Sequence, residues 1–484
     1  MSPDKYIKNY INGALVPAIS GEYFDNYNPA IGQVYSHIPD SDEKDVQLAI
    51  EAAERALPEW KKMEPAKRFR ILTRIADIIE QNLDEFAKAE SIDSGKPFAM
   101  ARSVDIPRAH QNIRFFATSL LHFSSESHAM PNEAINYTLR QPIGVVGCIS
   151  PWNLPLYLFT WKIAPALATG NCVIGKPSEM TPMTAYMLSK ACIEAGLPEG
   201  VLNIIHGFGA KTGQAIVEHP RIKAISFTGG TETGKKIIAT AGPMFKKLSL
   251  ELGGKNPNII FADCDVDEMM MTTLRSSFSN NGQICLCGSR IYVERAIYEK
   301  FRDELVKRTQ FLKIGDPFST VTDLGALVSK AHMEKVISYL TLAEVEGGTI
   351  LCGGTPVKMK GENADGYFLR PSVIEGLTQD CKTIQEEIFG PVVTITPFDT
   401  EEEVLGFANG TNYGLSATIW TKDISKANRM AENIDAGIVW VNCWMVRDLR
   451  TPFGGVKNSG VGREGGLEAM KFFTEPKNVC IKYS

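Results

Sequence analysis

The sequence lacks any long apolar run. Its longest apolar stretches, such as 143–149, are far shorter than the roughly 20 residues that a membrane-spanning helix needs. The first residues, 1–5, lead into polar sequence without the apolar core of a signal peptide. The net charge of -5 predicts no large basic surface, so we expect neither nucleic acid nor a membrane as a partner.

The sequence also lacks the cysteine and histidine patterns of disulfide frameworks and metal sites. The 10 cysteines are scattered, and Cys285 and Cys287 form the only close pair. The 7 histidines are isolated from one another and no CxxC motif occurs, so no metal site is expected. This use of cysteine is typical of free thiols in a reducing compartment, and we expect a cytoplasmic protein.

Strand and helix patterns alternate along most of the chain. At 484 residues the chain is too long for one core, and its length favours roughly three domain-sized units. Alternation of this kind predicts an α/β fold with parallel sheets covered on both faces by helices. Short apolar strands are predicted at 144–149, 171–175, 201–205 and 224–227, and a second run of alternation extends from 258–261 to 437–441.

Other segments lie outside this alternation. The region 42–90 has helical periodicity and predicts two or three amphipathic helices, punctuated by Pro58 and Pro65. More polar, two-sided strands are predicted at 135–139 and 478–483. Such strands can pair with each other or with a neighbouring subunit, so we expect a homodimer or homotetramer.

Two residues are candidates for covalent chemistry. Cys285 ends a glycine- and amide-rich turn, 280–284, in which few side chains would block a substrate. Glu251 precedes the pair Gly253 and Gly254, which could set the carboxylate on an exposed bend. We interpret Cys285 as a nucleophile that attacks a carbonyl group and Glu251 as the group that moves protons. The structural alternative is that Cys285 is a buried small hydrophobic residue.

A glycine turn after a predicted strand suggests phosphate binding. The segment 227–236 opens a helix, where backbone amides can bind phosphate. Gly229, Gly234 and Lys235 fit part of the P-loop pattern. However, Lys236 stands where a serine or threonine would hold magnesium, which disfavours a nucleotide hydrolase.

Two other segments have weaker nucleotide-binding signals. In 207–213, Gly207 and Gly209 resemble the start of a dinucleotide fingerprint, but the third glycine comes one position late. Lys176 and Glu179 follow another predicted strand and could hold the hydroxyl groups of a ribose. The alternative is that these glycines only form tight turns.

Together these motifs resemble one family, the NAD(P)-dependent aldehyde dehydrogenases. The resemblance covers nearly the whole chain. Within the family the sequence is most similar to the 2-hydroxymuconic and 2-aminomuconic semialdehyde dehydrogenases, chiefly at 105–108, 149–156, 161–162 and 440–450. The motifs occur in the family's order: Pro151-Trp152-Asn153, Lys176-Pro177-Ser178-Glu179, Phe227-Thr228-Gly229, Glu251-Leu252-Gly253-Gly254-Lys255, Gly282-Gln283-Ile284-Cys285, Glu386-Glu387-Ile388-Phe389-Gly390-Pro391 and Pro452-Phe453-Gly454-Gly455.

The resemblance implies a mechanism. Cys285 would attack the aldehyde and form a thiohemiacetal, whose oxyanion is held by the Asn153 side chain and the Cys285 backbone amide. Hydride would pass to the nicotinamide and leave a thioester. Glu251 would then activate the water that releases the acid, and Glu464 matches a position that relays protons in the family.

The resemblance also implies an NAD site. Glu179 would accept hydrogen bonds from a ribose 2′-hydroxyl and repel a 2′-phosphate, which favours NAD over NADP. Gly230 stands where many members have serine, so one hydroxyl contact to the pyrophosphate would be missing. The implied cofactor-binding residues are Ile149, Ser150, Trp152, Lys176, Ser178, Glu179, Gly209, Phe227, Thr228, Gly229, Gly230, Gly234, Leu252, Glu387 and Phe389.

The resemblance further implies a division into domains. Residues 1–122 and 143–252 would form the NAD-binding domain, and 253–465 the catalytic domain. Residues 123–142 and 466–484 would form a small β oligomerisation arm.

The substrate is suggested by arginines. In the family the segment before Pro452 lines the substrate tunnel, and here it carries Arg447. A planar guanidinium suits a carboxylate, so Arg447 and Arg108 are expected to hold the carboxylate of a muconic semialdehyde in aromatic or tryptophan catabolism. The alternative is that they pair with nearby acids, such as Asp448 or Asp105.

Other functions compete with this hypothesis. The chain could oxidise another small or aliphatic aldehyde. A cysteine hydrolase or acyltransferase would need a histidine near Cys285, and no histidine lies in any of the motifs. A non-catalytic protein on the same scaffold would tolerate loss of Cys285, Glu251 or Asn153, and all three are present. We interpret Cys287 as a packed small residue and not as a redox partner of Cys285.

Overall fold

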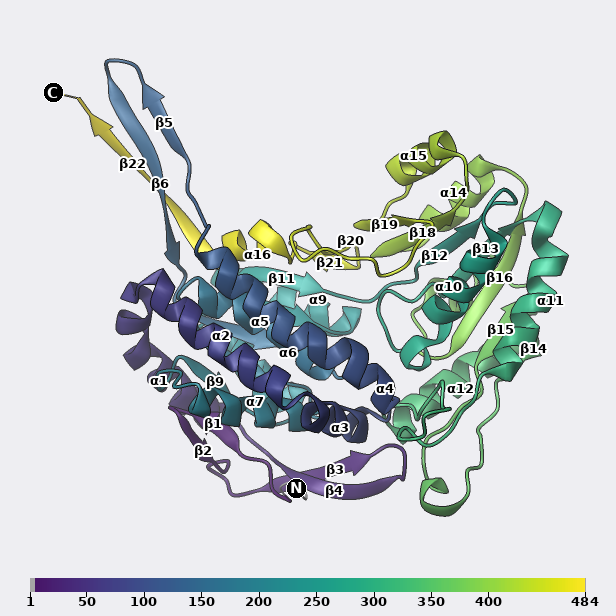
Figure 1. Cartoon of the computed structure of the whole chain (residues 1–484), viewed down its shortest axis with the longest axis horizontal. Coiled ribbons are helices and arrows are strands. Elements are labelled where there is room, and N and C mark those ends of the chain that lie inside the picture. The colour runs from purple at the N-terminus through teal and green to yellow at the C-terminus, as the bar shows by residue number, and fades with distance from the viewer. Residues whose placement is uncertain (1–4, 484) are drawn as a thin grey trace.

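A computed structural model describes residues 5–483 of the chain. It contains two lobes, each built on its own sheet, and a narrow arm that projects from the first lobe (Figure 1). The first, eight-stranded sheet has the order β2 (Ala14–Val16), β1 (Asn9–Ile11), β9 (Leu202–Ile204), β8 (Cys172–Lys176), β7 (Val145–Ile149), β10 (Ala224–Thr228), β11 (Lys247–Glu251) and β21 (Gly460–Val461).

The five strands from β9 to β11 run parallel, as their buried apolar sequences predict. From β7 the chain moves outward to β8 and β9, whereas β10 and β11 lie on the other side of β7. Because parallel crossovers are right-handed, movement in opposite directions places helices on opposite faces of the sheet. The order also creates a switch point between β7 and β10, where ligands bind in open α/β sheets.

Helices flank this sheet. The predicted helices in 42–90 are present, but Pro58 lies inside α1 and does not end it. Pro65 is the first residue of α2, where its missing N–H costs nothing. The elements are α1 (Glu43–Lys62), α2 (Pro65–Gln81), α3 (Leu83–Ser94), α4 (Phe98–Met100), the π-helical segment η1 (Ala101–Asp105), α5 (Ile106–Leu120), α6 (Pro155–Ala168), α7 (Met183–Glu194), the π-helical segment η2 (Gly209–Gly213), α8 (Gln214–Glu218) and α9 (Thr231–Ala241).

The second lobe has a seven-stranded sheet in which β14 alone is antiparallel. Its order is β14 (Thr349–Cys352), β15 (Ser372–Glu375), β16 (Val392–Phe398), β13 (Arg290–Glu294), β12 (Pro257–Ile260), β18 (Ser416–Trp420) and β19 (Ile438–Val441). Its helices are α10 (Val266–Phe278), α11 (Arg295–Phe311), α12 (Lys330–Val345), α13 (Lys382–Gln385), α14 (Glu401–Asn409) and α15 (Ile424–Asn433).

The arm is a three-stranded antiparallel sheet with β6 (Ala134–Pro142) between β5 (Ser127–Met130) and β22 (Thr474–Lys482). The two polar strands expected from the sequence therefore pair with each other, and β5 is an addition. Smaller elements are the hairpin of β3 (Tyr23–Asn28) and β4 (Gln33–Pro39), the pair β17 (Tyr413–Gly414) and β20 (Val456–Lys457), and α16 (Gly466–Phe472).

The α/β fold with two parallel-type sheets is confirmed. The domain boundaries stay a prediction. One detail crosses them, because β21, from the range expected for the catalytic domain, pairs with β11 in the first sheet. This pairing connects the segment before α16 to the strand that ends in Glu251.

Candidate active site

The predicted site residues meet where the strands of the first sheet end. Trp152 and Asn153 follow β7, Gly229 and Gly230 follow β10, and Glu251 is the last residue of β11. The turn that carries Cys285 comes from the second lobe, between α10 and β13. A cavity of about 240 Å³ is lined by residues of both lobes. They are Pro151, Trp152, Asn153, Thr228, Gly229, Gly230, Leu252, Gly253, Cys285, His332, Lys335, Glu387 and Phe389.

The turn before Cys285 is held rigidly. Asn280 and Asn281 have left-handed backbone angles, φ 52° and 56°, which asparagine tolerates better than most residues. The buried Asn281 side chain donates to the carbonyls of Gly325 and Ala326, both at 3.0 Å. On the other side, Asn256 Nδ2 donates to the Cys285 carbonyl at 2.7 Å. Hydrogen bonds from asparagine side chains therefore fix the position of Cys285 and of the turn before it.

The Cys285 thiol is neutral at rest. Burial raises its pKa, and the nearby carboxylates of Glu387 and Glu251 raise it further, whereas the Arg447 guanidinium lowers it. A base must therefore remove the proton before the sulfur can attack. Cys287 is buried in an apolar cluster with Ile284 and other residues, as expected of a packing residue.

Asn153 is buried and fixed at both ends. Its side-chain Nδ2 donates to the Gln283 carbonyl at 2.9 Å. One of the two amide hydrogens is used in that bond, so the second remains for an oxyanion. The Asn153 backbone carbonyl accepts from Lys96 Nζ at 2.8 Å and from Asn280 Nδ2 at 3.0 Å. The backbone N–H of Cys285 has no acceptor among residues 5–483, so two donors are available.

Glu251 is buried, and neither of its carboxylate oxygens has a hydrogen-bond partner in the described chain. Burial raises its pKa well above the usual range, and the neighbouring Glu464 adds to the rise. Glu464 in turn accepts from Lys162 Nζ at 2.7 Å and from Ser226 Oγ at 3.0 Å. Lys162 and Ser226 were not predicted as site residues. A lysine within the apolar helix α6 is the signal that could have identified Lys162.

The residues predicted to bind the ribose lie together at the end of β8. Lys176 Nζ donates to Glu179 Oε2 at 3.0 Å, and the Gly209 backbone N–H donates to Glu179 Oε1 at 3.2 Å. Burial alone would raise the pKa of Glu179, but the Lys176 ammonium and the hydrogen bonds lower it below its usual value. Glu179 is thus an ionised acceptor, the form that binds ribose hydroxyls. Ser178 lies beside them and accepts from the Met180 N–H.

The glycines predicted to bind the pyrophosphate, Gly229 and Gly230, lie between β10 and α9. Gly230 is the N-cap of α9, and a side chain at this position would meet nothing within 4 Å. Two buried hydroxyls nearby, Ser150 Oγ and Thr228 Oγ1, have no partner among the described residues. Open backbone, a helix N-terminus and unsatisfied donors together fit an anion. Other members of the set serve packing: Phe227 lies against Gly229, Leu252 lies against Gly234, and Ile149 is buried at the end of β7.

The remaining cofactor residues come from the second lobe. Glu387 Oε1 accepts from the Gly254 N–H at 2.9 Å. Phe389 has φ 61°, and its ring meets Trp152 edge-on at 5.2 Å. His332 Nε2 is 2.7 Å from the Phe389 carbonyl, and burial lowers the pKa of this histidine to about 4. A neutral His332 donating to this carbonyl explains how Phe389 is held, and it was not predicted from the sequence.

The two predicted substrate arginines meet at one tyrosine. Arg447 Nη1 donates to Tyr157 Oη at 3.2 Å, and the Arg108 guanidinium lies 5.9 Å from the centre of the Tyr157 ring. The Arg447 guanidinium also stacks on Trp161 and Phe453, at 4.4 and 3.8 Å from their ring centres. Its buried Nε and Nη2 groups have no partner within the described part of the chain. These two N–H groups are able to bind a ligand carboxylate.

The alternative ion pairs are not formed. Asp448 pairs with the exposed Arg450 at 2.6 Å, and Asp105 pairs with the buried Lys96. Neither Asp448 nor Asp105 therefore forms an ion pair with Arg447 or Arg108. No group of three or more metal-binding side chains occurs in residues 5–483, and none of the described helices is long and apolar enough to cross a membrane.

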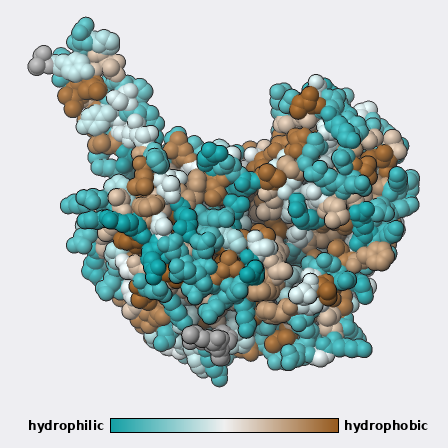
Figure 2. Space-filling view, viewed as in Figure 1, coloured by the Kyte–Doolittle hydropathy of each residue, from teal (hydrophilic) through white to brown (hydrophobic). Residues whose placement is uncertain are grey.

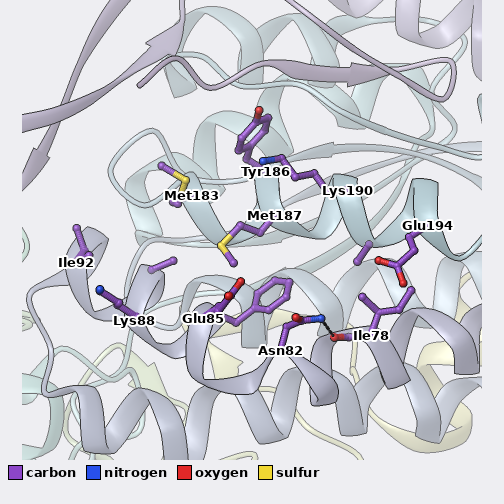
Figure 3. Close-up of a pocket in the computed structure, with 13 residues that line it drawn as sticks. Ile78, Asn82, Glu85, Lys88, Ile92, Met183, Tyr186, Met187, Lys190 and Glu194 are labelled. Carbon is purple, nitrogen blue, oxygen red and sulfur yellow. Dashed lines mark hydrogen bonds between the residues drawn. The ribbon is translucent and has the colours of Figure 1, made fainter. Parts of the chain in front are cut away.

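A second cavity, of about 290 Å³, lies between α2, α3 and α7 (Figure 3). Its lining includes Met183 and Met187 of α7, Phe86 of α3 and Ile78 of α2. None of the predicted site residues lines this cavity, so it is separate from the Cys285 site.

Comparison with known proteins decides the family. Residues 16–479 match the model of the aldehyde dehydrogenase family. The chain belongs to the aldehyde dehydrogenase family. The predicted enzyme class is therefore confirmed.

Relatives of this aldehyde dehydrogenase cover its full length. It is 51% identical to a 2-aminomuconic semialdehyde dehydrogenase of Danio rerio, with 100% of both chains covered. It is 47% identical to a 2-hydroxymuconic semialdehyde dehydrogenase of Pseudomonas sp. (strain CF600), with 99% of this chain and 100% of the other covered. A solved NAD+ complex of an aldehyde dehydrogenase from Bacillus cereus superposes with TM-score 0.97 at 39% identity, covering 100% of this chain and 98% of the other.

The raised pKa of Glu251 predicts a pH-dependent stability. The folded state retains the proton after the unfolded state has released it, so stability falls as the pH rises from about 4.5 towards the raised folded pKa. Glutamine does not titrate. The variant Glu251→Gln should therefore unfold at a higher temperature than the wild type above pH 4.5, and the gap should close below it. Thermal unfolding over a pH series tests this, with the exposed Glu59→Gln as a control, and a gap independent of pH contradicts it.

Proposed function

We propose that this enzyme oxidises 2-hydroxymuconic or 2-aminomuconic 6-semialdehyde to the dicarboxylic acid with NAD, in aromatic or tryptophan catabolism. The observation that carries the proposal is the pair of unsatisfied, buried N–H groups on Arg447 in the same site as Cys285. The charge of Arg447 slightly offsets the rise that burial causes in the pKa of both Cys285 and Glu251, so Arg447 lies near the reacting groups. The full-length similarity to two semialdehyde dehydrogenases supports the same substrate class.

The first chemical step follows from the two raised pKa values. The ionised form of Glu251, which becomes more abundant as pH rises, takes the thiol proton of Cys285. The sulfur then forms a bond to the aldehyde carbon, and the carbonyl electrons move to the oxygen. The Asn153 side-chain amide and the Cys285 backbone N–H donate to that oxyanion. When NAD is bound, it accepts the hydride that the aldehyde carbon loses.

The second step releases the acid. The substrate is now an acyl group on the sulfur of Cys285. The thiol proton held by Glu251 first passes to solvent, so that the free carboxylate can take a proton from water. The resulting hydroxide attacks the acyl carbon, and the Cys285 thiolate leaves. Glu464, with its bonds to Lys162 and Ser226, lies beside Glu251 and is placed to pass the collected proton onward.

The NAD site is proposed on the fit described above. Glu179 and Lys176 would hold the adenosine ribose, and the ionised Glu179 would repel a 2′-phosphate. The N-terminus of α9 with Ser150 and Thr228 would hold the pyrophosphate, and Glu387 the nicotinamide ribose. A missing hydroxyl at Gly230 is offset by the unsatisfied hydroxyls of Ser150 and Thr228. The competing cysteine hydrolase finds no support, since His332 bonds to the Phe389 carbonyl and not to Cys285.

Removal of the nucleophile tests the mechanism. The variant Cys285→Ala should lose at least about 10⁴-fold in kcat, because no acyl intermediate can form. NADH formation with the semialdehyde measures the loss, and retained binding of NAD shows that the variant is folded. Activity that survives in Cys285→Ala contradicts the covalent mechanism. The buried Cys287→Ala should remain active and serves as the matched control.

Removal of Arg447 tests the substrate class. The variant Arg447→Ala should lower kcat/KM for the muconic semialdehyde by about 100-fold, since charge-assisted bonds to a carboxylate are worth roughly 1.5–3 kcal/mol. A neutral aliphatic aldehyde should be affected much less. The exposed Arg450→Ala, whose partner is Asp448, should leave both unchanged. Equal losses with both aldehydes in Arg447→Ala would rule out the anion-binding role.

The arm is proposed to join copies of this chain. Both of its outer strands, β5 and β22, are almost wholly exposed, and apolar residues such as Leu139 and Ile481 lie on its surface (Figure 2). Unpaired edge strands of this kind invite pairing with another chain. Light scattering should give the mass of a dimer or tetramer for the wild type and a smaller species for Leu139→Glu/Ile481→Glu. A monomeric wild type contradicts the proposal.

A further inference from the structure

Lys96 and Asp105 form an ion pair that is completely buried. Both side chains have 0% exposure, and Lys96 Nζ donates to Asp105 Oδ2. Lys96 follows α3, and Asp105 is the last residue of η1, so the pair joins two segments of the first lobe. Neither residue has a part in the steps described above.

The pair reaches the active centre through the backbone of Asn153. The Lys96 ammonium also donates to the Asn153 carbonyl, at 2.8 Å. That carbonyl receives a second bond from Asn280, which belongs to the turn before Cys285. The position of the Asn153 amide relative to the sulfur therefore depends on bonds made to the Asn153 backbone from both lobes.

Other buried hydrogen bonds hold the start of α6, just after Asn153. The buried Glu90 of α3 accepts from the Leu156 N–H at 3.4 Å and from Thr184 Oγ1 at 2.8 Å. Asn112 of α5 donates to the Tyr157 carbonyl at 3.0 Å. Asn153, Leu156 and Tyr157 are thus each held by a buried polar side chain of α3, α5 or the segment after α3.

Energetics argue against a purely stabilising role for the ion pair. Burying two charges costs several kcal/mol each, and well-packed apolar residues in place of a buried pair are often neutral or stabilising. Apolar side chains could pack in the same position. The Lys96 ammonium instead donates to the Asn153 carbonyl, next to the reacting groups. The ion pair fixes the position of Asn153, and an apolar substitute would not.

We propose that Lys96, oriented by Asp105, is a positioning residue that sets the Asn153 amide for the oxyanion. This inference rests on the proposed function, in which Asn153 holds that oxyanion. Lys96 does not touch the substrate and acts only through Asn153. η1 adds to the placement, because π-helical turns often occur where a helix must aim a side chain at a functional site.

The test replaces both charges at once, so that neither is left unpaired. The variant Lys96→Met/Asp105→Leu should fold and bind NAD like the wild type, but kcat should fall by about 10- to 100-fold with semialdehyde and neutral aldehyde alike. A double-mutant cycle with Asn153→Ala gives the decisive readout. If Lys96 acts through Asn153, the triple variant should be no slower than Asn153→Ala alone. Additive losses in the cycle, or full activity of the double variant, overturn the proposal.

Two further variants keep the result interpretable. Lys246 is another buried lysine that donates to a backbone carbonyl, His219, at 2.7 Å, and Lys246→Met should lower the unfolding temperature without changing kcat. If the apolar double variant does not fold, Lys96→Gln/Asp105→Asn is carried through the same cycle with the same two outcomes. Failure of the proposed function differs from either result, since the wild type itself would then not oxidise the semialdehyde.

Discussion

The active centre depends on the removal of ionisable groups from water. Burial raises the pKa of the Cys285 thiol and of the Glu251 carboxyl, so the charged form of each is disfavoured in the site. A neutral thiol does not react with passing oxidants or aldehydes without a base. Arg447 forms no ion pair within the described part of the chain, which leaves its positive charge free to attract an anionic substrate. The same desolvation thus governs protection, reactivity and selectivity.

The topology makes this burial possible. The segment that leads from β7 into the first turn of α6 lies at the switch point of the first sheet, and it carries both Asn153 and Tyr157. One short segment therefore carries the amide proposed to bind the oxyanion and the tyrosine that both Arg108 and Arg447 contact. A substrate with an aldehyde at one end and a carboxylate at the other would fit only if its length matched the separation between Asn153 and the two arginines.

Much of this arrangement could be predicted from the sequence, because it is local. The strands β7, β8 and β10 are short apolar runs followed by glycine or polar turns, and the chemistry lies at their ends. The order of the motifs added the family and the roles. Features built by long-range contacts could not be predicted. The pairing of β21 with β11, the bond from Lys162 to Glu464, and the contact between His332 and Phe389 join segments that have no common pattern in the sequence.

The position of Pro58 and the partners of Asp448 and Asp105 also depend on the fold and not on the local sequence. Pro58 suggested a helix boundary but lies inside α1, because the effect of proline on a helix depends on its neighbours in the fold. The fates of Asp448 and Asp105 were open in the sequence, where both lie close to an arginine. In the structure each has another partner, Arg450 or Lys96. Only packing decides which of several nearby charges pair.

The arm also constrains the time order of synthesis and assembly. β6 lies between β5 and β22 and pairs with β22 along its whole length, but β22 is translated hundreds of residues later. Until then β6 has an open edge, and closing so long a loop is slow. The arm therefore cannot be complete before the strands of both lobes have been translated. The surface proposed to contact other copies of the chain is therefore the last part of the described chain to be completed.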